Sequence, residues 1–148
     1  MVLAQKEADY LLSLHKFIVE KTIDFPSMNS LLTLNVKSCN TNDVFLLDIN
    51  RKGRISLSRC TFYHRYNTII GLVRLDLDKD KVHTNPDGEK IIGPHIHIYR
   101  EEYDTRWAYA LDDFEDWRFI PGKDFVDMFY DFCQYCNISY SLIQGSLI

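Results

Sequence analysis

The stretch that most constrains the fold is Asn85-Pro86-Asp87-Gly88. Asparagine first, proline second and glycine fourth is the composition typical of a type I turn. The turn lies between Leu-Asp-Leu-Asp (75–78) and His-Ile-His-Ile (95–98), and both segments alternate apolar with polar residues, as half-buried strands do. We therefore predict an antiparallel hairpin that joins strand 69–82 to strand 91–100.

A turn centred between Pro86 and Asp87 predicts which residues of the two strands face each other. The numbers of facing residues then sum to about 173, and apolar residues meet apolar residues on the buried face. The pairs on the buried face are Leu77 with Ile96 and Leu75 with Ile98; those on the opposite face are Asp78 with His95, Asp76 with His97, and Arg74 with Tyr99.

This register places His83 outside the cluster, about 16 Å along the strand from the level of His95 at about 3.3 Å per residue. An alternative register stays open, because a bulge at Gly93-Pro94 would shift the pairing by one residue. Such a shift would exchange the two faces and separate the histidines from the aspartates.

The predicted histidine–aspartate face has three interpretations. As a metal site it would use His95, His97, Asp76 and Asp78, a donor set that suits zinc, manganese or iron. As a catalytic site for phosphate chemistry it would use His97 with an aspartate as general base and Arg74 or Arg100 for the phosphate; the candidate catalytic set is His95, His97, Asp76, Tyr99 and Arg100. As a solvated sheet face it would do no chemistry at all.

The rest of the chain predicts an α+β fold with an antiparallel meander of about five strands, in a single domain spanning residues 1–148. An amphipathic helix is expected from about residue 4 to residue 21, with Leu11, Leu14 and Ile18 facing the sheet. A second helix is expected within 121–138, and residues 139–148 form either a last strand or an apolar extension. The further predicted strands are 31–38, two within 43–66 around a basic turn at Arg51–Arg54, and 106–111.

Composition narrows the class of protein. Apolar residues make up 46% of the chain, enough for a core, and no apolar run reaches the roughly 20 residues that a membrane helix needs. We expect a cytoplasmic protein without a secretory signal. Cys133 and Cys136 have the spacing of a metal knuckle, but the chain has no second close pair, and their aromatic helical setting favours packing in the core.

Charge is unevenly distributed along the chain. The net charge is −4, yet residues 101–131 hold 3 Lys/Arg against 10 Asp/Glu. The acidic stretch also carries aromatic residues, and the candidate partner-binding residues are Asp112, Asp113, Glu115, Asp116, Tyr103 and Trp117. Carboxylates spaced in this way can imitate a phosphate backbone, and exposed aromatic rings anchor interfaces. The alternative is an acidic loop that solvates the surface while its aromatic residues fill the core.

The segment HTNPDGEKIIGPHIHIYREEYDTRWAYAL, residues 83–111, resembles a family of small uncharacterised proteins encoded by phages and Gram-positive bacteria. The Pro-His-Ile-His motif followed by an aromatic residue also resembles short proteins encoded beside toxin–antitoxin genes. The resemblance implies a genetic setting of phage defence and counter-defence. It implies no activity and no catalytic residue.

Two functions from different classes follow. The first is a phage or mobile-element accessory protein that binds the basic groove of a nucleic-acid-handling machine and inhibits it, as anti-CRISPR proteins do; the acidic aromatic stretch favours it, and we rank it narrowly first. The second is a small toxin-type endoribonuclease or metal-dependent phosphoesterase, with zinc or manganese as the open choice of cofactor and RNA as the substrate. Its basic residues would be Arg51, Lys52, Arg54, Arg59, Arg65 and Arg74.

Overall fold

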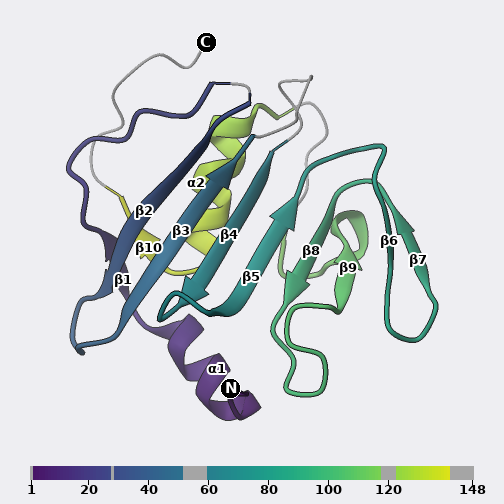
Figure 1. The fold of residues 1–148 in the computed structure, drawn as a ribbon, viewed down its shortest axis with the longest axis horizontal. Helices are drawn as coiled ribbons and strands as arrows, with labels where there is room; N and C mark the ends of the chain where they lie inside the picture. Colours follow the sequence, from purple (N-terminus) through teal and green to yellow (C-terminus); the bar gives the residue numbers. More distant parts are fainter. Residues whose placement is uncertain (1, 28, 52–59, 118–122, 141–148) are drawn as a thin grey trace.

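A large twisted sheet with one long helix on its inner face forms the body of the protein (Figure 1). The computed structural model describes residues 2–27, 29–51, 60–117 and 123–140. The elements are α1 (Gln5–Ser13), β1 (Lys16–Ile18), β2 (Leu31–Ser38), β3 (Val44–Asn50), β4 (Thr61–Tyr66), β5 (Ile70–Asp76), β6 (Val82–Thr84), β7 (Lys90–Ile92), β8 (His95–Ile98), β9 (Ala108–Ala110), the 3-10 turn Leu111–Asp113, α2 (Phe125–Tyr135) and β10 (Ile138–Ser139). The predicted α+β class is confirmed.

The sheet is larger than the predicted meander. Eight strands pair in the order β10-β1-β2-β3-β4-β5-β8-β9, and β6 pairs only with β7 in a separate two-stranded ribbon. All neighbours in the large sheet are antiparallel except β1 and β10 at one edge, which are parallel. The sequence prediction missed β1 and β10 because short edge strands of two or three residues carry no alternation to recognise.

The predicted N-terminal helix of 4–21 is wrong at its C-terminal end. The helix α1 ends at Ser13, and Ile18 lies in β1 instead of on the helix. The buried Lys16 ammonium donates hydrogen bonds to the carbonyl oxygens of Leu11, Leu12 and Leu14, which are left free where a helix ends. Of the predicted stripe, Leu11 and Ile18 are buried, whereas Leu14 is only partly buried.

The core lies between the sheet and α2. Apolar side chains of β2, β3 and β4 point to this face, and Phe62 contacts both Phe129 and Phe132 of the helix at ring-centroid distances of 5.9 and 5.6 Å. Cys133 and Cys136 are free thiols buried in the same core, as their setting predicted. Asp124 caps the N-terminus of α2, and its carboxylate accepts a hydrogen bond from the Asp127 amide.

The predicted basic turn between β3 and β4 lies mostly outside the described residues, which end at Arg51 and resume at Cys60. Arg51 is not part of an exposed basic surface. Its side chain is 1% exposed, and its Nη1 donates a hydrogen bond of 2.8 Å to the Pro26 carbonyl. Residues Lys52, Arg54 and Arg59, and the tail 141–148, fall outside the described ranges.

Candidate histidine cleft

The pairing of β5 with β8 keeps the predicted faces but not the predicted register. Asp76 lies opposite His95, and Arg74 lies opposite His97, so facing numbers sum to 171. The shift from about 173 is two residues, which leaves Leu75 and Ile96 buried on one face and the histidines on the other. The one-residue slip considered for Gly93-Pro94 does not occur. Ile98 is partly buried, while Leu77 is buried as predicted.

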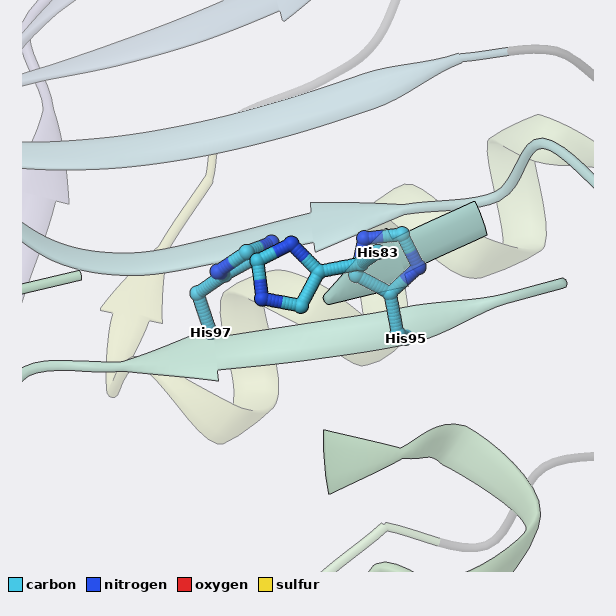
Figure 2. Close-up of side chains that lie close together, drawn as sticks. All are labelled: His83, His95 and His97. Carbon is cyan, nitrogen blue, oxygen red and sulfur yellow. The ribbon is translucent and has the colours of Figure 1, made fainter. Parts of the chain in front are cut away.

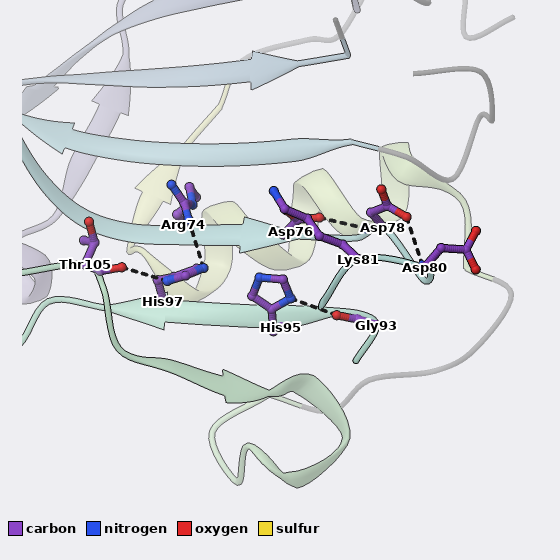
Figure 3. Close-up of polar contacts among 9 residues, drawn as sticks. All are labelled: Arg74, Asp76, Asp78, Asp80, Lys81, Gly93, His95, His97 and Thr105. Atoms are coloured by element: carbon purple, nitrogen blue, oxygen red, sulfur yellow. Dashed lines mark hydrogen bonds and ion pairs between the residues drawn. The ribbon is translucent and has the colours of Figure 1, made fainter. Parts of the chain in front are cut away.

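Aspartate side chains explain the shift. The Asp76 carboxylate accepts a hydrogen bond from the Asp78 amide at 2.9 Å, and the Asp78 carboxylate accepts one from the Asp80 amide at 3.0 Å (Figure 3). Each is a bond to the backbone two residues ahead, which competes with strand pairing and turns the chain. The segment read as a continued strand therefore leaves the sheet after Asp76, and the chain resumes as the separate ribbon of β6 and β7.

The predicted turn closes this ribbon instead of the β5–β8 pair. The Gly88 amide donates to the Asn85 carbonyl at 2.8 Å, and Gly88 has φ of +94°, a conformation that glycine adopts without strain. Behind the turn, His83 pairs with Ile91.

Asn85 fastens the ribbon to β9. Its side-chain amide donates to the Ala108 carbonyl at 2.9 Å, and its side-chain oxygen accepts from the Ala108 amide at 2.8 Å. Asn85 is 2% exposed, so these two bonds are shielded from water. The ribbon is thereby held beside the edge of the large sheet, where the first residue of β9 pairs with His97.

The ribbon brings a third histidine to the pair on β8. Figure 2 shows His83 beside His95 and His97, with the three rings grouped together. The ring centroid of His83 lies 5.4 Å from that of His95 and 4.7 Å from that of His97. One ring nitrogen of each histidine lies within 4.8 Å of the other two. The prediction that His83 stands about 16 Å away is therefore wrong, because it assumed one continuous flat hairpin.

Hydrogen bonds determine which nitrogen of each ring carries the proton. Nδ1 of His95 lies 2.8 Å from the Gly93 carbonyl oxygen and Nδ1 of His97 lies 2.7 Å from that of Thr105, so both nitrogens must donate. Nε2 of His83 lies 3.0 Å from both the Asn85 side-chain oxygen and the Arg106 carbonyl. In the neutral rings the lone pairs are therefore on Nδ1 of His83 and on Nε2 of His95 and His97.

Burial keeps the two β8 histidines neutral. It lowers the pKa of His97 from 6.5 to about 3, with further lowering by the charge of Arg74 and by the neighbouring histidines. Burial also lowers the pKa of His95, against the opposing effect of Asp76. The Arg74 guanidinium donates a hydrogen bond of 3.0 Å to Nε2 of His97, which only a neutral ring can accept (Figure 3).

Asp76 and Asp78 were predicted metal or catalytic residues, and the structure gives them other partners. The Asp76 carboxylate is 1% exposed and forms an ion pair of 3.0 Å with Lys81. Burial raises its pKa, but the hydrogen bond from the Asp78 amide and the contact with Lys81 outweigh burial, so its pKa lies below the ordinary value. Asp76 thus lies opposite His95, while the group of ring nitrogens consists of histidines alone.

His83 and His97 line a cleft of about 550 Å³ between the ribbon and the large sheet, whereas His95 is buried behind them and is not among its lining residues. Its lining residues are Arg74, His83, Thr84, Pro86, His97, Thr105 and Arg106. Two arginines, two histidines and two threonines therefore line one space, and none of these seven described residues carries a carboxylate. The Nε of Arg106 donates a hydrogen bond of 3.1 Å to the Tyr103 carbonyl. Such a lining suits an anion with several acceptor oxygens.

Comparison with known proteins adds a family. A family of unknown function, DUF6978, matches residues 3–138. The chain belongs to the DUF6978 family. Neither a curated protein nor a solved structure matches it. The family description assigns no activity, so the function of this DUF6978 member is inferred from its geometry. Among the described residues, no helix is long and apolar enough to cross a membrane.

Two other predicted catalytic residues lie outside the cleft of this DUF6978 member. The Tyr99 hydroxyl donates to the Leu3 carbonyl and accepts from the Leu3 amide, so it anchors the N-terminal segment. Arg100 lies over the rings of Tyr103 and Trp107, 5.7 and 4.7 Å from their centroids. Both residues follow the end of β8 at Ile98, and beyond a strand the alternation no longer predicts to which face of the sheet a side chain points.

The carboxylates at 112, 113, 115 and 116 are exposed, but two aromatic residues predicted to bind with them are not free anchors. Trp117 is 6% exposed and packs against Phe132 and Tyr135 of α2, as in the alternative in which the aromatic residues fill the core and not as an exposed interface anchor. Tyr103 is half-buried in a stack with Trp107. The carboxylate residues of the predicted binding surface, Asp112, Asp113, Glu115 and Asp116, are all exposed.

Sequence reasoning missed Arg106, Thr84 and Thr105, and it excluded His83. One sequence signal could have placed two of these residues. His83 and Thr84 directly precede the tight turn at 85–88, so they must lie close to that turn wherever it is in the fold. The contribution of Thr105 and Arg106 depends on how the loop after β8 returns to β9, and no local pattern predicts that return.

Proposed function

We propose that this protein cleaves phosphodiester bonds of RNA in the histidine cleft. The single observation that carries the proposal is the convergence of Arg74, Arg106, His83 and His97 on one cleft. Guanidinium groups bind phosphate oxygens through paired hydrogen bonds, and imidazole is the side chain best suited to move protons near neutral pH.

RNA is the favoured substrate because it carries its own nucleophile. Attack by the 2′-hydroxyl forms the O2′–P bond and breaks the P–O5′ bond, which leaves a 2′,3′-cyclic phosphate and a 5′-hydroxyl. The reaction needs a base for the 2′-hydroxyl proton, a proton for the departing 5′-oxygen and positive charge around the phosphorane. His83, whose Nδ1 lone pair is free in the neutral ring, is the proposed base, and the protonated ring then returns the proton to O5′. Arg74 and Arg106 stabilise the added negative charge.

The test compares a labelled single-stranded RNA with DNA of the same sequence, using the full chain. The wild-type protein should cut only the RNA, and the products should end in a cyclic or 3′ phosphate. Arg106→Gln and His83→Ala should each lower kcat by about 10²-fold, the effect of removing one stabilising donor or proton-transfer group.

Arg65→Gln is the matched control. The sequence predicted Arg65 among the RNA-binding cations, but in the structure it pairs with Asp48 at 2.8 Å and does not line the cleft. Its cleavage rate should equal that of the wild type. A wild-type protein that leaves RNA intact with and without added metal, or an Arg106→Gln variant that cuts at the wild-type rate, would refute the proposal.

We propose a second function on one further observation, the four exposed carboxylates at 112, 113, 115 and 116. They suit docking on the basic groove of a nucleic-acid-handling machine, as expected of an anti-CRISPR-like accessory protein of a phage or mobile element. Because Trp117 is buried, it cannot serve as the exposed aromatic anchor of such an interface, and we rank this function second.

A further inference from the structure

Each histidine of the cluster is held from behind by a carbonyl oxygen. The bonds are from His83 Nε2 to the Asn85 side chain and the Arg106 backbone, from His95 Nδ1 to Gly93, and from His97 Nδ1 to Thr105. Metal-binding histidines characteristically donate their second nitrogen to a carbonyl or carboxylate, which selects the tautomer and orients the ring. All three rings have this arrangement, although they come from two separate pieces of sheet.

The spacing of the rings fits one ion after a small adjustment. Zinc binds imidazole nitrogen at about 2.0–2.1 Å, so three tetrahedral ligands lie about 3.3 Å apart. One nitrogen of each histidine is already within 4.8 Å of the others. Rotation of the side chains, together with a slight approach of the ribbon that carries His83, closes the difference.

The donor set indicates the class of metal. Three neutral imidazoles without a carboxylate suit zinc and its neighbours, whereas magnesium and calcium require oxygen ligands. Three protein ligands also leave a fourth tetrahedral position for water or substrate, which distinguishes catalytic zinc sites from closed structural ones.

We infer that His83, His95 and His97 bind a single zinc ion whose open position faces the cleft. This inference deepens the proposed cleavage function. Zinc would occupy the Nδ1 lone pair of His83, so a zinc-bound water of lowered pKa, instead of the His83 ring, would serve as the base beside the phosphate-binding arginines. Asp76 and Asp78 are not ligands, and the third ligand comes from the β6–β7 ribbon.

Arg74 competes with the metal. Its guanidinium donates to Nε2 of His97, and this lone pair is the one that zinc would take. A guanidinium and a divalent cation also repel each other at short range. Arg74 must therefore move into the cleft when zinc binds, where it is placed to hold a substrate phosphate.

The first experiment titrates zinc into the chelator-treated 148-residue chain by calorimetry. The wild type should bind one ion per chain, and His83→Ala, His95→Ala and His97→Ala should each weaken binding by more than about 100-fold, beyond the effect of losing an outer-shell partner. His15→Ala, at an exposed histidine, is the control and should bind like the wild type. Unchanged affinity in His83→Ala, or no binding by the wild type, would overturn the inference.

A second measurement uses the unaltered protein and does not depend on whether the variants fold. Cobalt(II) bound by three imidazoles and water in a four-coordinate site absorbs visible light strongly, whereas octahedral cobalt absorbs weakly. The wild-type protein should give the strong spectrum, and added zinc should abolish it. A weak octahedral spectrum would contradict the three-histidine site.

Arg74→Gln tests the competition. Removing the donor and its charge should raise zinc affinity by about tenfold, whereas Arg65→Gln should leave the affinity unchanged. Weaker binding by Arg74→Gln than by Arg65→Gln would refute the placement of zinc at Nε2 of His97.

The two proposals fail separately. Zinc binding with no RNA cleavage leaves the metal site and removes the nuclease. RNA cleavage by a protein that binds no zinc leaves the nuclease and removes the metal site.

Discussion

At the scale of single residues, one buried side chain, Asn85, joins the turn, the edge strand β9 and His83. Asn85 is the first residue of the turn, and its side chain forms hydrogen bonds with both the amide and the carbonyl of Ala108. Its side-chain oxygen also accepts a hydrogen bond from Nε2 of His83. A carboxamide is suited to this role because it presents a donor and an acceptor side by side. An aspartate of the same shape would lack the donor.

Asn85→Ala should lower the free energy of unfolding by about 2–4 kcal/mol, because a buried amide and a buried carbonyl of Ala108 lose their partners. Urea denaturation measures the loss, and faster hydrogen exchange at the Ala108 amide would locate it. Asp87→Ala, in the exposed part of the same turn, is the control and should cost less than about 1 kcal/mol. Equal losses in the two variants would show that Asn85 acts only through the turn.

The buried His64 should make the stability of the fold depend on pH. It is fully buried and stacks on Phe45, and burial followed by the charge of Lys16 lowers its pKa from 6.5 to about 3. The unfolded chain therefore takes up a proton at a higher pH than the folded chain does. Stability from this group is complete above about pH 6.5 and falls as the pH drops from there towards 3.

The melting temperature should therefore fall between pH 7 and pH 4. His64→Leu cannot take up a proton, so its melting temperature should fall less over the same range. His15→Ala, at an exposed site, serves as the control. A His64→Leu profile parallel to that of the wild type would contradict the prediction.

At the scale of elements, the sequence predicted strands better than their connections. Alternation gave β2 with its observed bounds, Leu31–Ser38, and apolar spacing placed α2 within its predicted range. The β5–β8 faces were also predicted, since a two-residue shift preserves alternation. The register and the position of His83 were not, because side-chain bonds of Asp76 and Asp78 end β5 early, and alternation cannot distinguish a strand from successive aspartate turns.

Substitution of Gly93 tests whether the connection between the ribbon and β8 positions the ribbon. Its φ is +94°, and a Cβ there would lie 3.4 Å from the Lys79 carbonyl oxygen. Gly93→Ala should cost about 1–2 kcal/mol in unfolding and, by tilting the ribbon, weaken zinc binding. Gly88→Ala has the same φ of +94° but open space, so it should cost a similar amount with unchanged zinc affinity. Calorimetry that finds equal zinc affinity in both variants would contradict the role of this junction.

At the scale of the whole molecule, charge is divided between regions. The net charge is −4, yet the cleft gathers Arg74 and Arg106, while the loop 112–116 exposes four carboxylates. The sequence left open whether the aromatic residues of the acidic stretch are exposed or fill the core, and the burial of Trp117 could not be decided from it because that burial depends on the distant helix α2. The proposed RNA-binding surface thus consists of two arginines on a protein of net negative charge.

Binding of single-stranded RNA should consequently depend weakly on salt. With about two phosphates neutralised, the slope of log affinity against log salt is about −1.4, or about a sevenfold loss from 50 to 200 mM salt. Fluorescence anisotropy with a non-cleavable RNA measures this slope. A slope of −4 or steeper would indicate a much larger basic surface than this cleft.

Reversing the charges at Asp112, Asp113 and Asp116 to lysine separates the two proposed functions. These side chains are exposed, so the melting temperature should change little. RNA cleavage should remain within about threefold of the wild type if the cleft is the functional site, since exposed charges outside it are screened by salt. If the reversed variant still cleaves RNA while His83→Ala does not, the result supports the proposed RNA cleavage. If the reversed variant no longer inhibits a nucleic-acid-handling partner that the wild type inhibits, the result supports the proposed inhibitor.

The ribbon of β6 and β7 carries one histidine of the set, while β8 carries the other two. The large sheet and the third histidine of the cluster therefore lie on separable parts of the chain. Undocking the ribbon at Asn85 would dismantle the site and leave the large sheet and its core in place. If the cleft cleaves RNA as proposed, the protein would have an inactive state that is still folded, reached by moving one short ribbon, so its activity and its stability need not change together.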